Sequence, residues 1–367
     1  SGKTTLLYAR IRARAEAGKR SILLVPEQFT SSTEARIYRE LGDALSGMVE
    51  SYSFTSLAEH ILAVEGGAAV QTLTDAGRAV LVRRALEELQ DNVHYYYRHR
   101  RSAAFCQMAA ETIDELKSAG LSGQQLQELA RDCGTESAKL GELALIFQGY
   151  ESLLAGTGMD PADRLELAAD RLEAALARDE LPDFLREREV FIDEFDTFNA
   201  PKKRLMGAML AALPAVTVAL CEDGAPMQPG DLELFSGAKQ VAAQLRQLAR
   251  KNGAQVAAPE LLRRDLRHKD APGLAALTEL LETGSCTPPE SAPELRLFAA
   301  ASREEEARCA AAAIRRLMRQ GVRCGKIAVV CRDISLYRAA VRYEFRMAEI
   351  PLYCDEPTTP EFSAPAT

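Results

Sequence analysis

Ser1-Gly2-Lys3-Thr4-Thr5 opens the chain and has the form of the second half of a phosphate-binding loop. In the complete pattern a glycine lies five positions before Gly2, and backbone N–H groups hold the phosphates. The lysine reaches the β- and γ-oxygens, and the threonine hydroxyl binds Mg²⁺. We therefore expect Lys3 to bind phosphate and Thr4 to bind Mg²⁺, with a helix over about residues 5–17.

A second segment gives this motif its weight. Residues 190–195 read VFIDEF, an apolar strand that ends in the two carboxylates Asp193 and Glu194. This arrangement suits an aspartate that holds Mg²⁺ and a glutamate that polarises a water molecule for attack on the γ-phosphate. The two segments together predict a nucleoside triphosphatase. We also expect the strand that begins at Val190 to lie beside the strand entering the phosphate loop, so that Lys3 and Asp193 converge on one cleft.

Length and composition are those of a globular protein of more than one domain. The chain has 367 residues, of which 47% are hydrophobic and 27% charged, and no apolar run is long enough to span a bilayer. Its eight cysteines form no CxxC pair, which favours reduced thiols in a cytoplasmic protein over disulfides or a zinc site. The net charge of −8 argues against a dedicated nucleic-acid binder, although motors confine their basic groups to one groove.

The pattern along the chain alternates between two structural types. Short β-rich runs at residues 21–25 and 49–54 separate helical stretches, as in a nucleotide-binding α/β domain. Residues 74–180 show helical spacing broken by glycines, and so predict an all-helical insertion. Beyond a Pro/Ser/Thr-rich linker, a strand at 294–298, a helix capped by Ser302 and a strand at 326–331 predict a second α/β unit. The expected parts are a first lobe (1–73 and 181–236), a helical insertion (74–180), a helical or linker region (237–293) and the start of a second lobe (294–367).

Two basic clusters admit two interpretations each. Residues 94–101 read HYYYRHRR and residues 263–269 read RRDLRHK. Basic side chains beside aromatic rings suit single-stranded nucleic acid, because the rings can stack on bases. Both segments are equally compatible with a solvated loop or helix end, and the sequence leaves this choice open.

Five segments, in this order, carry a family resemblance. The chain resembles the N-terminal part of the AddB family, the B subunits of bacterial ATP-dependent helicase/deoxyribonucleases, over nearly its whole length. The segments are LVPEQFT (24–30), SYSFTSL (51–57), VFIDEFDTF (190–198), IAVVCRDISLY (327–337) and IPLYCD (350–355).

The resemblance implies a fold, cofactors and partners. The expected fold is a RecA-like P-loop NTPase lobe with an all-helical insertion, followed by the start of a second RecA-like lobe, as in motors of the superfamily that contains UvrD and RecB. The family implies ATP, Mg²⁺, single- and double-stranded DNA, an AddA-type helicase–nuclease partner and a role in repairing double-strand breaks by recombination. It places the nuclease domain and its iron–sulfur cluster in a C-terminal part that this chain lacks.

Site residues are carried over by position. Asp193 matches the Mg²⁺-associated acid, Glu194 stands where many members of the family have glycine, and Arg332 matches an arginine that contacts the γ-phosphate from the second lobe. The expected ATP-binding residues are Ser1, Gly2, Lys3, Thr4, Thr5 and Gln28. The expected contacts to single-stranded DNA are Thr30, Ser53 and Phe54.

Two departures leave a second function open. The third helicase motif is poorly matched by Glu222-Asp223, because Pro226 stands where a glutamine is expected. A scaffold that binds DNA and a partner without hydrolysing ATP is therefore the alternative to a motor. We also expect residues before Ser1 in the natural polypeptide, and poor ATP binding by a chain that starts there, since half of the phosphate loop would be missing.

Overall fold

A computed structural model describes residues 2–69, 71–89, 91–96, 99, 101–224, 234–262 and 267–354. The chain divides into two compact units. The first runs to Asp270 and includes Thr278–Ser285, and the second comprises Ala271–Leu277 and the residues from Cys286 onward.

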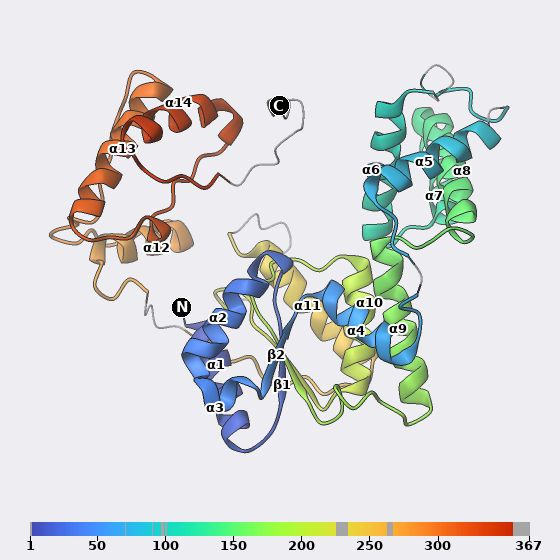
Figure 1. The fold of residues 1–367 in the computed structure, drawn as a ribbon, viewed down its shortest axis with the longest axis horizontal. Coiled ribbons are helices and arrows are strands. Elements are labelled where there is room, and N and C mark those ends of the chain that lie inside the picture. Colours follow the sequence, from blue (N-terminus) through green and yellow to red (C-terminus); the bar gives the residue numbers. More distant parts are fainter. Residues whose placement is uncertain are drawn as a thin grey trace, which may run out of the picture. The chain divides into compact units, whose positions relative to one another are not determined.

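A sheet of four parallel strands forms the centre of the first unit (Figure 1). The strands are β1 (Ser21–Leu24), β2 (Val49–Tyr52), β3 (Glu189–Ile192) and β4 (Ala215–Val218), in the order β2-β1-β3-β4. Leu24 stands opposite Tyr52 on one side and Ile192 on the other. The α/β class is thus confirmed. The strand at Val190, β3, pairs with β1 and β4. Its pairing with a strand that enters the phosphate loop stays a prediction, because such a strand comes before the loop and thus before the described residues.

Both faces of the sheet are buried, which explains why β1 is apolar at three successive positions. Successive side chains of a strand point to opposite faces. Ile22 and Leu24 accordingly pack in one hydrophobic cluster, while Leu23 and Val25 pack in another. A parallel sheet covered on both faces has this near-continuous apolar pattern.

Helices from different parts of the chain cover the two faces (Figure 1). One face is covered by α1 (Lys3–Glu16), α2 (Thr30–Leu41) and the short α3 (Asp43–Ser46), and the one-turn 3₁₀ helix η1 (Glu27–Phe29) precedes α2. The opposite face is covered by α4 (Phe54–Glu65), α9 (Pro161–Ala177), α10 (Ala200–Ala212) and α11 (Ser236–Lys251).

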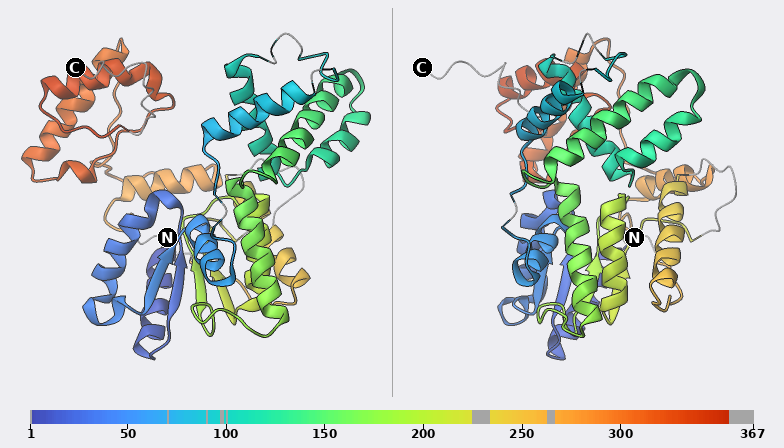
Figure 2. Two further views of the ribbon diagram at one scale, coloured as in Figure 1. Left: turned by 45° about the vertical axis from the view of Figure 1, so that its right-hand side comes forward. Right: turned by 90° about the vertical axis from the view of Figure 1, so that its right-hand side faces the viewer.

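The predicted helical insertion is present, with its own core. It consists of α5 (Asp75–Glu88), α6 (Ala103–Ser118), α7 (Gly123–Arg131), the 3₁₀ turn η2 (Gly134–Glu136) and α8 (Ser137–Leu154). Val82, Ile113 and Phe147 are among the residues of a cluster confined to these helices and their connections. In its described residues the only β-type pairing is the isolated bridge of Thr72 to Met159 at its base. We call α5–α8 the helical module; Figures 1 and 2 place it beyond the sheet, next to the N-terminal end of α9.

Helix α9, predicted from the sequence to be part of the insertion, packs on the sheet instead. Leu165, Ala168 and Leu172 belong to the same hydrophobic cluster as Ile22 and Ile192. The helix therefore belongs to the lobe by packing, although its apolar spacing resembles that of the module helices.

The second unit is built around α13 (Arg303–Arg319) and α14 (Ile334–Met347), whose cluster includes Ile314 and Phe345. Helix α12 (Pro272–Thr283) crosses the boundary between the units, and η3 (Cys324–Lys326) is a single 3₁₀ turn. Ser302 accepts the N–H of Glu305, as predicted. The strands predicted at 294–298 and 326–331 join no ladder in the described part of this unit. Leu297 is 99% exposed and Val330 90% exposed, so these segments lack the packing that a β-strand needs.

Within the described ranges, no helix is both long and apolar enough to cross a membrane. All eight cysteines lie in those ranges, and none is in a disulfide.

Candidate nucleotide-binding site

The carboxyl edge of the sheet gathers most of the predicted site. Because the strands are parallel, the residues that follow β1, β2 and β3 all lie at one edge. Helix α1 precedes β1 through a short turn at Ala17 and Gly18, and it packs on the sheet through Leu7 and Tyr8. It therefore runs antiparallel to β1, and its first turn lies at this same edge. Ligands of open parallel sheets bind at such edges.

The start of α1 has the features of an anion site. Gly2 adopts φ 96°, ψ 7°, a left-handed conformation that a side chain would strain, and it offers no side-chain cap to the helix. The N–H groups of the first turn consequently remain available, and a helix N-terminus attracts negative charge. Lys3 has no ion-pair partner in the described part of the chain, and Thr4 and Thr5 lie in the same turn. Ser1 lies outside the described residues.

Asp193 lies directly after β3 and close to α1. Its N–H donates to the carbonyl of Leu24 (3.1 Å), which continues the β1–β3 ladder, and the residue is 4% exposed. Burial raises the pKa of the Tyr8 hydroxyl to about 12; the positive charge of Arg36 opposes this shift and the negative charge of Asp193 adds to it. Asp193 is thus within electrostatic range of α1. No hydrogen bond or ion pair joins Lys3 to Asp193 among the described residues, and their convergence on one cleft stays a prediction.

Glu194 has a strained backbone. Its φ of 65° places a non-glycine residue in the left-handed region, and its side chain is exposed. Such conformations cost roughly 1–3 kcal/mol and persist where the surrounding structure holds them. The left-handed conformation turns the chain between the buried Asp193 and the buried Phe195. The Glu194 side chain is consequently exposed to solvent at the sheet edge.

The residues predicted to contact DNA have structural roles here. Ser53 caps α4 through a reciprocal pair of hydrogen bonds with Ser56. Phe54 is only 2% exposed and packs edge-to-face on Phe195 (5.3 Å between ring centroids). Stacking on a base would require this ring to leave the core.

The remaining predicted contacts of the first lobe lie between β1 and α2. The hydroxyl of Thr30 donates to the carbonyl of Glu27 (2.8 Å), and Gln28 is exposed in η1. DNA binding by Thr30, Ser53 and Phe54 and nucleotide binding by Gln28 remain predictions.

Arg332 lies in the second unit and is exposed. A solvent-exposed arginine could pair with a nearby acid such as Asp333 or Glu344. Asp333 instead accepts hydrogen bonds from the backbone and hydroxyl of Ser335, and Glu344 pairs with Arg308 (3.1 Å). Arg332 has no ion-pair partner in the described region, and its contact with a nucleotide remains a prediction.

The weakly matched third motif is engaged elsewhere. Asp223 pairs with Lys239 of α11 (3.1 Å), whose side chain is 3% exposed. This contact holds Asp223 in a structural ion pair. Pro226 lies outside the described residues.

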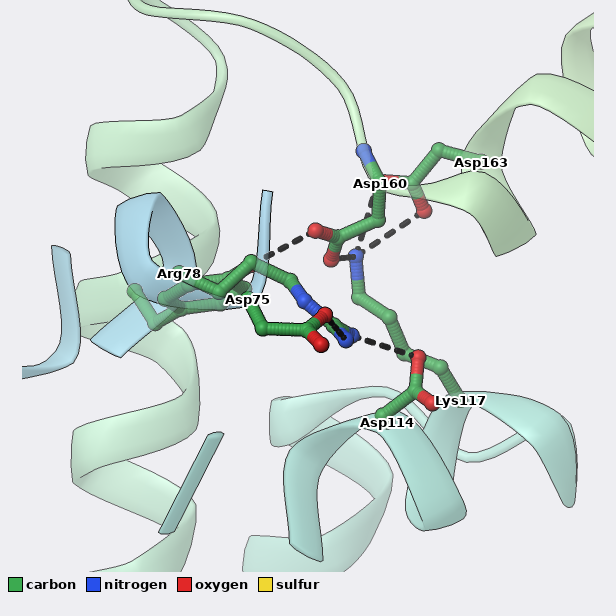
Figure 3. A network of polar contacts seen from close by, with 7 residues as sticks. Asp75, Arg78, Asp114, Lys117, Asp160 and Asp163 are labelled. Atoms are coloured by element: carbon green, nitrogen blue, oxygen red, sulfur yellow. Dashed lines mark hydrogen bonds and ion pairs between the residues drawn. The ribbon is translucent and has the colours of Figure 1, made fainter. Parts of the chain in front are cut away.

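A buried ionic network that no sequence motif indicated joins the module to the lobe (Figure 3). The ammonium of Lys117, at the end of α6, donates to Asp160 (2.9 Å) and Asp163 (2.8 Å) at the start of α9. Tyr150 of α8 donates to Asp160 (2.6 Å). Burial alone would lower the pKa of Lys117, but Asp163 and Asp160 outweigh it and raise the pKa, so the ammonium stays charged. The only local signal was Asp160-Pro161, which is typical of a helix start.

No group of three or more His, Cys, Asp or Glu side chains gathers as a metal site among the described residues. A Mg²⁺ ion at Thr4 and Asp193 would need phosphate oxygens and water as its other ligands, as is usual for this ion.

The fold and this edge define the class of protein: a parallel α/β protein with a helical module inserted between β2 and β3 and a helix that starts after Gly2 without a side-chain cap. Residues 1–278 match the family model described as ADDB, N-terminal, and the chain belongs to this family.

Curated relatives agree with this assignment. Proteins named as the B subunit of ATP-dependent helicase/deoxyribonuclease are 34% identical in Desulforudis audaxviator and 32% identical in Moorella thermoacetica, each over 97% of this chain. The counterpart in Symbiobacterium thermophilum is 32% identical over 94% of the chain. The chain spans 31%, 32% and 30% of the length of these relatives, respectively.

Proposed function

We propose that this chain is the helicase-like N-terminal region of a B subunit that works with an AddA-type partner on double-strand DNA breaks. In this proposal the region binds ATP–Mg²⁺ and single-stranded DNA in the cytoplasm. Membership of the family and the names of the relatives support it. Nuclease activity and an iron–sulfur cluster would belong to the remaining length of such a protein.

The observation that carries the proposal is the start of α1. Gly2 in a left-handed conformation, an unpaired Lys3 and the free N–H groups of the first turn fit the terminal phosphates of a nucleotide. Bound Mg²⁺ would neutralise phosphate charge, with Thr4 and Asp193 as its protein ligands. Lys3 would hold the phosphate oxygens, the Glu194 carboxylate would accept a proton from the attacking water, and Arg332 would approach from the second lobe.

The test is DNA-stimulated ATP hydrolysis by the full-length protein assembled with a partner whose own ATP site is inactivated, so that only turnover by this chain is measured. Lys3→Ala and Glu194→Gln should each lower kcat by about 100-fold or more, because they remove phosphate binding and the proton acceptor respectively. Lys19→Ala is the matched control, an exposed lysine in the turn after α1, and should leave kcat unchanged. Equal rates in all four proteins would contradict the proposal.

The alternative is a scaffold that binds DNA and partner without turnover, and the pairing of Asp223 with Lys239 favours it. In that case the assembled complex would bind DNA normally, and its ATP hydrolysis would not respond to Lys3→Ala.

A further inference from the structure

The loop between α5 and α6 holds one of the two basic–aromatic clusters. Residues 94–101 carry three arginines, two histidines and three tyrosines, and no acidic side chain. Tyr97, Arg98 and Arg100 lie outside the described residues. The described positions of interest are Tyr95, Tyr96, His99 and Arg101, together with the groups that hold them.

A buried carboxylate fixes the start of this loop. Glu142 of α8 is 8% exposed and accepts three successive backbone N–H groups, those of His94 (2.7 Å), Tyr95 (2.5 Å) and Tyr96 (3.1 Å). A buried carboxylate is costly unless it is well hydrogen-bonded, and bonds from N–H groups to a charged acceptor are among the strong ones. The loop therefore has one defined backbone conformation at these residues.

The aromatic side chains form a supported platform. Tyr95 is 58% exposed, and its ring meets that of Tyr96 edge-to-face at 4.9 Å between centroids. Tyr96 in turn packs on Phe105 (5.0 Å), which belongs to the core of the helical module. A ring that is exposed on one side and supported on the other loses little conformational freedom when a ligand stacks on it.

The described basic side chains of this loop form no ion pair, unlike those on the helices of the module. On the helices of the module Arg83 pairs with Glu87, Arg84 with Glu88 and Lys139 with Glu136. Arg101 is exposed and has no carboxylate partner within the described part of the module, and His99 is exposed beside it.

We propose that this platform binds single-stranded nucleic acid, with a base stacked on Tyr95 and backbone phosphate held by Arg101 and His99. Stacking on an exposed aromatic ring next to cations is the usual chemistry of single-strand binding. This inference rests on the proposed function, because single-stranded DNA is the ligand proposed there. It adds a contact on the helical module to those predicted at the sheet edge.

The test measures binding of a fluorescent oligothymidine to the 367-residue chain, without ATP. Tyr95→Ala should weaken binding by about 5-fold to 100-fold, the range for loss of one stacked base, while Tyr95→Phe should keep it. Tyr38→Ala is the matched control, because Tyr38 of α2 is also 58% exposed, and it should have no effect.

A second arm tests the phosphate contact. Arg101→Gln should make the slope of log K against log salt shallower by about 0.7, the value for one phosphate of a single strand. Arg84→Gln, which removes an arginine already paired with Glu88, should leave the slope unchanged.

Two results would overturn the inference. One is that the unaltered chain binds oligothymidine and that Tyr95→Ala and Arg101→Gln bind it equally well. The DNA contact would then lie elsewhere on the chain, and the proposed function would stand. The other is loss of binding to the AddA-type partner, with oligothymidine binding unchanged, in Tyr95→Ala, which would make the platform a protein interface. The proposed function is tested separately, by the ATP hydrolysis of the Lys3→Ala and Glu194→Gln variants.

Discussion

Lys117 is the residue whose charge connects the helical module to the sheet-bearing lobe. Its side chain is 8% exposed and that of Asp160 2% exposed, so neither charge is well solvated. Removing one partner of a buried pair leaves the other charge unpaired, which typically costs about 3–5 kcal/mol. The stability of the fold is therefore expected to depend on this position.

We predict that Lys117→Met lowers the free energy of unfolding by about 3–5 kcal/mol, measured by urea denaturation. Lys139→Met is the matched control, since Lys139 pairs with Glu136 at the surface and such pairs contribute at most about 1 kcal/mol. Similar losses in both variants would show that burial of the network has no special energetic weight.

For individual residues, the sequence predicted some positions of the candidate site and missed contacts that depend on the fold. Gly2, Lys3 and Asp193 could be proposed as site residues from the sequence because a short local pattern carries their chemistry; their role stays a prediction. Phe54 was predicted to contact DNA, yet it is buried against Phe195, a contact between segments that are far apart in the sequence. Pairings of that kind follow from the fold, as does the bond of Glu142 to the loop at His94, and no local pattern indicates them.

Among the elements, the helical module behaves as a separable insertion. The N–H of Leu73 donates to Met159 (3.0 Å) and the N–H of Met159 to Gln71 (3.0 Å), so the chain leaves and re-enters the lobe at one place. The hydrophobic clusters of module and sheet are also distinct.

We predict that replacing residues 75–157 by a short Gly-Ser linker leaves a lobe that still unfolds in one cooperative transition, followed by circular dichroism. The sheet keeps α4, α9 and α10 in such a variant, and their packing does not involve the module core. Deleting residues 161–177 instead removes α9 from the sheet and should abolish the transition. Loss of cooperativity in the first variant would mean that the lobe depends on the module.

Helices were predicted better than strands, for a physical reason. A helix satisfies its backbone internally, so spacing and caps locate it, and the helical character expected for residues 74–180 is present in α5–α9. The helical stretch expected between the β-rich runs at 21–25 and 49–54 is divided by Gly42 (φ 72°, ψ 174°) into α2 and α3. A strand needs a partner, which the apolar segments 294–298 and 326–331 lack in the described second unit.

In the first unit, an ion pair links the start of β3 to β2 across the intervening strand β1. Arg188, just before β3, donates to Glu50 of β2 (2.6 Å), and Tyr52 donates to the same carboxylate (2.8 Å). Burial alone would raise the pKa of Glu50, but the hydrogen bonds from Arg188 and Tyr52 and the arginine charge outweigh it and lower the pKa below its ordinary value of 4.5.

A folded-state pKa below the ordinary value determines in which direction stability changes with pH. The stabilisation by Glu50 is present above the ordinary pKa and is lost as the pH falls through the lowered one. We predict that the urea midpoint of the unaltered chain falls between pH 6 and about pH 3 by more than that of Glu50→Gln, which cannot lose the charge. Glu87→Gln, in an exposed pair, should follow the unaltered chain. Parallel acid profiles for all three proteins would refute a role for Glu50.

The bridge between Thr72 and Met159 also bears on how the chain folds. If the intervening segment of roughly 85 residues were an unstructured loop, bringing its ends together would cost about 4 kcal/mol of chain entropy. A module that folds on its own core brings those ends together beforehand. The connection from β2 to β3, which also contains α4 and α9, is then effectively shortened by the length of the module. The effective sequence separation between β3 and its partner strand β1 is therefore smaller once the module has folded. We expect the module to fold first and the sheet to form after it.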